Sequence, residues 1–116
     1  MDRGVRVAAW GCVVVLALLS LLPGQEMVRT GFGGRYEHLV AYTGTAFFMG
    51  LAYGRAAGLV TLGAGLVAYA GALEMAQTLA PGRHAAVGDF LAGAAGVLVG
   101  LALALGARSL RRSATP

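Results

Sequence analysis

The chain has 116 residues, enough for one domain, and 58% of them are hydrophobic while only 12% are charged. Soluble domains carry about 25% charged residues, so this composition excludes an ordinary soluble globule and predicts a membrane protein. The net charge of +4 comes from arginine alone, and because the arginines lie at the ends of apolar runs rather than along one stripe, the sequence also argues against a nucleic-acid binder.

The first apolar run covers residues 7–22 and follows a short basic start. It is near the lower length limit for crossing a bilayer, which usually takes about 20 apolar residues. A secretory signal peptide is the competing interpretation, because a basic start before an apolar stretch is typical of one. No small-residue cleavage motif follows Leu22, since Pro23 comes next, and we therefore expect an uncleaved span. The single cysteine, Cys12, excludes an internal disulfide.

A polar, glycine-rich loop is predicted at residues 23–37, and three further apolar runs follow it. These runs cover residues 38–54, 56–80 and 89–107, and a basic tail occupies 108–116. The predicted fold is therefore all-α: a single polytopic membrane domain of four transmembrane helices in a compact bundle.

The arginines predict the orientation of this bundle. Six lie at the two termini and in the second connection: Arg3, Arg6, Arg55, Arg108, Arg111 and Arg112. The other two loops carry three, partly offset by acidic residues: Arg29, Arg35 and Arg83. Because cytoplasmic loops carry the excess of arginine, we expect both termini in the cytoplasm and the first and third loops outside.

Several polar residues then share the outer membrane face. His38 opens the second run, Glu74 and Gln77 lie near the end of the third, and Asp89 opens the fourth. With a rise of about 1.5 Å per residue, Glu74 lies roughly 10 Å inside a helix end at Pro81. An ionisable residue inside a membrane helix suggests a functional site, so we expect one outward-facing polar pocket.

Small residues repeat every four positions in the last run, at Ala92, Gly96, Gly100 and Ala104. Such stripes let helix backbones approach closely in lipid. The stripe would serve packing within one chain or between copies, so a homo-oligomer is an open alternative.

Three groups of residues together resemble the VanZ-like family of small bacterial membrane proteins: Arg35-x-x-His38 with Tyr42, Glu74-x-x-Gln77 with Arg83, and Asp89 followed by Gly93, Gly96 and Gly100. The family usually has an Asp-Lys pair where this chain has Gly34 and Arg35, and often an asparagine where it has Gly93. One member is associated with teicoplanin resistance. The resemblance implies a multi-pass protein of the bacterial cytoplasmic membrane that acts in the cell envelope, with a link to glycopeptide resistance.

The candidate catalytic residues are Glu74, His38 and Asp89. A buried carboxyl and an imidazole can exchange protons near neutral pH, so these groups would move protons or orient a leaving group. The alternative is a structural polar cluster in which Glu74 pairs with Arg83 or His38, because an unpaired carboxylate in apolar surroundings is very costly.

The candidate substrate-binding residues are Arg83, Arg35, Gln77 and Tyr42. The planar fork of arginine suits phosphate and carboxylate, although anchoring to lipid headgroups is the plainer role. The expected partners are membrane lipids, and specifically an anionic lipid or a cell-wall precursor. Three functions stay open: a protein that binds or processes such a molecule, a non-catalytic scaffold, and a small oligomeric transporter.

No metal site or cofactor is predicted, because the dense ligand spacing of zinc motifs is missing. No nucleophilic triad is predicted either, since Cys12 lies at the wrong end of the chain and Ser20 has no positioned base.

Overall fold

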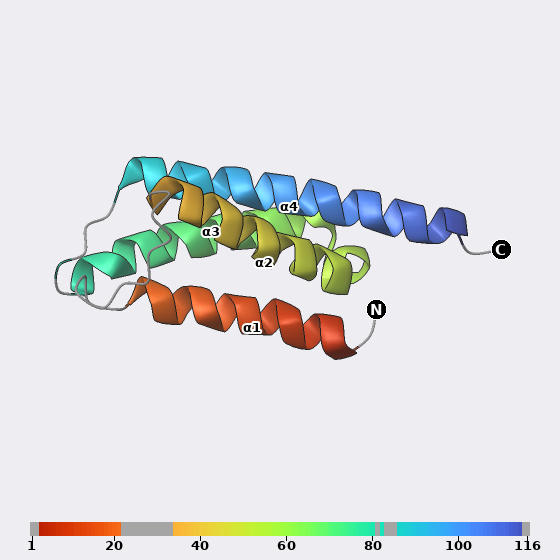
Figure 1. The fold of residues 1–116 in the computed structure, drawn as a ribbon, viewed down its shortest axis with the longest axis horizontal. Helices are drawn as coiled ribbons and strands as arrows, with labels where there is room; N and C mark the ends of the chain where they lie inside the picture. Colours follow the sequence, from red (N-terminus) through yellow and green to blue (C-terminus); the bar gives the residue numbers. More distant parts are fainter. Residues whose placement is uncertain (1–2, 22–33, 81, 83–85, 115–116) are drawn as a thin grey trace.

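The computed structural model describes residues 3–21, 34–80, 82 and 86–114. Every regular element within these ranges is helical. The elements are α1 (Arg3–Ser20), α2 (Gly34–Ala57), α3 (Leu59–Ala76), the short 3₁₀ helix η2 (Gln77–Leu79) and α4 (Val87–Ala114). The four α-helices lie side by side, which confirms the all-α prediction and the four-helix arrangement (Figure 1).

Three of the helical segments in the described residues are long and apolar enough to cross a membrane. They are Arg3–Ser20, Leu59–Leu79 and Val87–Arg111. α2 is the less apolar helix, and it contacts all three of the others. Two of its polar side chains are enclosed by protein: Tyr42 and Thr45 are buried, and the Thr45 hydroxyl donates to the Ala41 carbonyl of the same helix. A helix enclosed by neighbours can carry such residues because their polar groups are satisfied internally.

The outer surface of the helices is strongly apolar. Large side chains that are half exposed or more include Val14 and Leu18 on α1, Val60 and Met75 on α3, and Leu98 on α4. Soluble monomers rarely expose apolar surface of this extent, whereas a bilayer covers it. The surface therefore agrees with the membrane class that the composition predicts.

α4 packs on α2 through small residues. A Cβ atom added at Gly96 would lie 2.6 Å from the Leu39 carbonyl oxygen, and one added at Gly50 would lie 2.6 Å from Cβ of Ala104. Gly96, Gly100 and Ala104 are all buried. In lipid there is no hydrophobic driving force between helices, because the lipid tails are as apolar as the side chains. Close approach of the backbones is therefore a main source of attraction between the helices.

A glycine and a proline determine where α3 begins and where the helical segment that follows it ends. Gly58, between α2 and α3, has φ 83° and ψ 147°, a positive-φ conformation that glycine adopts without strain. At the other end, η2 finishes at Leu79 and Ala80 is extended, with ψ 134°. The residue before a proline is restricted to such conformations, so Pro81 ends the helix through Ala80.

Every helix differs from its predicted run by a few residues at one end or both, and the difference is clearest at the start of α2 and the end of α4. α2 begins at Gly34, so Arg35 and Glu37 are in its first turn rather than in the preceding loop. α4 continues to Ala114, so the region predicted as a basic tail is mostly helical. Alanine, leucine and arginine are good helix formers and no proline occurs between Val87 and Pro116, which explains the extension.

The start of α1 and the end of α4 lie at the same end of the bundle (Figure 1). The start of α2, the end of α3 and the start of α4 lie at the opposite end. This second end brings together His38 of α2, Glu74 of α3 and Asp89 of α4.

Candidate functional site

Three ionisable side chains from three helices meet at this end of the bundle. His38 lies in the second turn of α2, Glu74 in the last turn of α3 and Asp89 in the first turn of α4. One nitrogen or oxygen atom from each lies within 4.8 Å of the other two. We call these three residues the polar cluster. They are the residues that the sequence predicts to converge.

Glu74 is the centre of the polar cluster. Its side chain is buried, with 6% of the residue exposed. Oε2 accepts a hydrogen bond of 2.7 Å from the backbone N–H of Ala86, and Oε1 lies 3.5 Å from Nε2 of His38. Both carboxylate oxygens therefore have a partner, which a buried carboxylate requires.

Ala86 connects Glu74 to the start of α4. Its carbonyl accepts hydrogen bonds from the N–H groups of Asp89 and Phe90, so it begins the helix. The N–H group of a residue at this position has no partner within its own helix, and Glu74 supplies one. The same carboxylate thus ties α3 to both α2 and α4.

The ring of Tyr42 supports His38 one helical turn away. The two ring centroids are 6.2 Å apart and the planes differ by 22°, a stacked arrangement. Tyr42 is 3% exposed and lies against Gly93, where an added Cβ would be 3.1 Å from the ring. Absence of a side chain at Gly93 leaves room for Tyr42, which in turn limits the positions that the imidazole can take.

Arg35 places a positive charge beside the polar cluster. Its guanidinium lies against Gly88, because a Cβ added there would be 2.6 Å from the Arg35 Cζ atom. Gly88 directly precedes Asp89, and Arg35 itself is exposed. The cation is therefore accessible from outside while the carboxyl of Glu74 is not.

The predicted substrate-binding residues do not all lie next to the polar cluster. Tyr42 and Arg35 lie next to the polar cluster, as described. Gln77 is 3% exposed and begins η2, one turn beyond Glu74. Arg83, and the neighbouring His84, lie outside the described residues. Chemical roles for all of these residues remain predictions.

Sequence reasoning missed the backbone contribution of Ala86 and the contact between Gly88 and Arg35. A backbone N–H is present in every residue except proline, so no residue type marks the one that binds Glu74. Gly88 precedes an acidic helix start, but nothing in its identity shows which side chain fills the space beside it.

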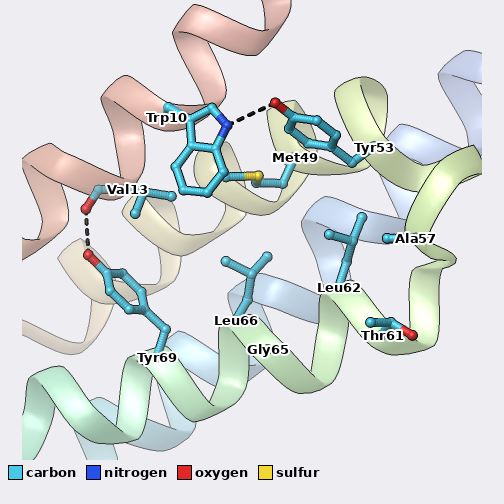
Figure 2. A pocket seen from close by; sticks show the side chains of 10 residues that line it. All are labelled: Trp10, Val13, Met49, Tyr53, Ala57, Thr61, Leu62, Gly65, Leu66 and Tyr69. Carbon is cyan, nitrogen blue, oxygen red and sulfur yellow. Dashed lines mark hydrogen bonds between the residues drawn. The ribbon is translucent and has the colours of Figure 1, made fainter.

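A second feature, an apolar cavity of about 390 Å³, lies between α1, α2 and α3 (Figure 2). Two hydrogen bonds border it: the Trp10 indole N–H donates to the Tyr53 hydroxyl at 2.8 Å, and the Tyr69 hydroxyl donates to the Val13 carbonyl at 2.5 Å. Leu66 and other apolar side chains complete the lining. The cavity shares no lining residue with the polar cluster.

Comparison with protein-family models, with curated proteins and with solved structures finds no match to this chain. Argument about function therefore rests on the geometry of the site and on the residues that resemble the VanZ-like pattern.

Proposed function

We propose that this chain is a VanZ-like protein of the bacterial cell envelope that binds or processes an anionic lipid or a cell-wall precursor. The observation that carries the proposal is the meeting of His38, Glu74 and Asp89 at one end of an apolar bundle, with the guanidinium of Arg35 beside them. Ionisable groups are costly in a membrane helix and are usually kept there for function.

The proposed topology has four spans, with α2 as the fourth, and places the polar cluster at the outer face of the cytoplasmic membrane. α2 lies alongside the three more apolar helices and contacts each of them (Figure 1). Two facts support the orientation. The start of α1 and the end of α4 lie at the end remote from the polar cluster (Figure 1), and six of the nine arginines occur in the sequence near these two helix ends or near the end of α2.

Arg35 is suited to hold the anionic group. Guanidinium binds phosphate and carboxylate through two parallel hydrogen bonds, and the exposed Arg35 is accessible to a lipid headgroup. Arg83 would add a second cation in this proposal. The apolar part of the lipid would stay in the bilayer against the exposed apolar faces of the helices.

The polar cluster is suited to proton transfer. Glu74 Oε1 and His38 Nε2 are 3.5 Å apart, so a small closure brings them into hydrogen-bonding distance. In a hydrolysis or transfer reaction, one group would take a proton from the attacking water or hydroxyl while its oxygen bonds to phosphorus or carbon. Another would give a proton to the leaving oxygen as its bond breaks.

A non-catalytic scaffold is the second candidate, and one observation favours it. Both oxygens of Glu74 already have partners within the protein, one of them a backbone N–H. A carboxylate bound in this way joins three helices without any substrate. In that case Glu74→Gln and His38→Ala would lower the melting temperature in detergent and no lipid pool would change, whereas unchanged melting of both variants would count against the scaffold.

Native mass spectrometry of the purified protein tests the binding proposal. We expect the wild type to retain an anionic lipid or precursor and Arg35→Gln to retain much less of it. Arg55→Gln is the matched control, because Arg55 is also exposed on α2 but lies in its last turn, at the other end of the bundle. Equal retention by Arg35→Gln and Arg55→Gln would contradict a headgroup site at the polar cluster.

A further inference from the structure

We propose that His38, Glu74 and Asp89 bind a divalent transition-metal ion, with zinc as the first candidate. The sequence alone predicts no metal site, because no two of these residues have the short spacing of a zinc motif. That criterion detects ligands on one element, whereas here each ligand comes from a different helix. Imidazole together with carboxylate is a ligand set that suits zinc.

The distances are close to those of a bound ion. Zinc lies about 2.0–2.2 Å from nitrogen and oxygen ligands, so tetrahedral ligands are roughly 3.4 Å apart. His38 Nε2 and Glu74 Oε1 already have this separation, at 3.5 Å. All three ligand atoms lie within 4.8 Å of one another, so closing the set on an ion requires shifts of about 1.4 Å or less.

The groups around the ligands hold them in suitable orientations. Ala86 N–H binds Glu74 Oε2, which leaves Oε1 directed at His38 and available to the ion. The stacked ring of Tyr42 restrains the imidazole of His38. Hydrogen bonds and contacts of this kind are what orient ligands in known metal sites, where their loss usually weakens metal binding by about 10–100-fold.

Charge also favours a dication. Glu74 and Asp89 bring two carboxylates within 4.8 Å of each other next to one imidazole, in a part of the bundle where Glu74 is buried. Two ionised carboxylates at this distance repel each other, and the repulsion grows as water is excluded. Among the described residues, the guanidinium of Arg35 contributes a positive charge nearby, but it lies against Gly88 on the exposed side. An ion between the three ligands would offset the carboxylate charges directly.

Three protein ligands leave one coordination position open, as in catalytic zinc sites. A water molecule or a phosphate oxygen of the lipid would occupy it, and with the ion present a metal-bound water would give up the proton in place of a direct exchange between Glu74 and His38. Only this last step rests on the proposed function, since binding of the ion itself requires no lipid.

The test measures metal bound to the purified chain, produced with a tag that contains no histidine. After treatment with a chelator and dialysis against dilute Zn²⁺, we expect one zinc per chain by plasma mass spectrometry. Glu74→Gln and Asp89→Asn should weaken zinc binding at least tenfold in a competition titration. Glu37→Gln is the matched control, because Glu37 is a neighbouring carboxylate on α2 outside the polar cluster; it should bind as the wild type does.

Absence of stoichiometric zinc in the wild type, or equal binding by Glu74→Gln and Glu37→Gln, would overturn the proposal. If the variants fail to fold, Co²⁺ added to the wild type decides instead: intense visible absorption of a four-coordinate complex supports the site, and the weak spectrum of hydrated Co²⁺ overturns it. The lipid-retention experiment is independent, so zinc binding without retained lipid would support this site and contradict the proposed function.

Discussion

Replacing Gly100 by alanine tests the packing of α4 on α2. An added Cβ would lie 2.7 Å from the Ala46 side chain and 2.9 Å from the Phe47 backbone nitrogen, and closer still to the Thr43 carbonyl oxygen. Favourable contacts between carbon atoms are about 3.5–4.0 Å. Because two of the three atoms belong to the backbone of α2, no side-chain rotation relieves the overlap and the two helices must separate.

The expected magnitude follows from two opposing effects. Overpacking a well-packed contact costs about 1–3 kcal/mol. Alanine is preferred to glycine inside a helix by about 0.5–1 kcal/mol. Gly100→Ala should therefore lower the free energy of unfolding by about 1 kcal/mol, within a range of roughly 0–2.5 kcal/mol.

Gly106→Ala is the matched control for this change. Gly106 is on the same helix and is exposed, and nothing lies within 4 Å of an added Cβ. This variant keeps only the gain in helix preference, so it should be as stable as the wild type or up to about 1 kcal/mol more stable. Unfolding in mixed micelles with increasing SDS, followed by circular dichroism, measures both variants. Equal stability of Gly100→Ala and Gly106→Ala would refute the account of the α2–α4 contact.

Three other predictions concern single contacts. Gly58→Ala should lower stability by about 1–3 kcal/mol in the same assay, because φ is 83° and ψ is 147° there. Gly65→Ala, at a helical glycine with open space, should not lower it, and equal behaviour of the two variants would argue against the positive-φ conformation at Gly58. Tyr69→Phe should cost about 0.5–1.5 kcal/mol through loss of its hydrogen bond to the Val13 carbonyl, and an unchanged melting temperature would mean that this bond does not hold α1. Gly88→Ala should displace the flexible Arg35 side chain, with little effect on melting but weaker retention of anionic lipid; unaltered retention would place the anion elsewhere.

Much of the fold follows from the pattern of apolar residues. The four apolar runs become the four helices, because each is long enough for one helix and is bounded by arginine, proline or glycine. Small residues predict a close contact but not its partner; the structure shows that Gly96 and Gly100 lie against α2. Helix ends are predicted less well. Gly34 begins a helix where a loop is predicted, and Arg111 continues a helix where a tail is predicted, because the local sequence at a helix end only weakly determines its last residue.

The meeting of His38, Glu74 and Asp89 could also be predicted, because alternating helix directions bring these three positions to one end. Their distances could not, since they depend on how closely the helices pack at Gly93 and on the backbone N–H of Ala86. The apolar cavity gives no sequence signal, because its lining residues are ordinary for a membrane helix.

Lipid mass spectrometry of growing cells tests the central claim most directly. The cultures carry an empty vector, the wild type, Glu74→Gln or Glu37→Gln at matched expression. The account predicts that one anionic lipid or precursor pool changes with the wild type and Glu37→Gln, and stays at the empty-vector level with Glu74→Gln. An equal change with Glu74→Gln would contradict a function at the polar cluster, and unchanged pools in every culture would leave the cluster as a structural link between helices.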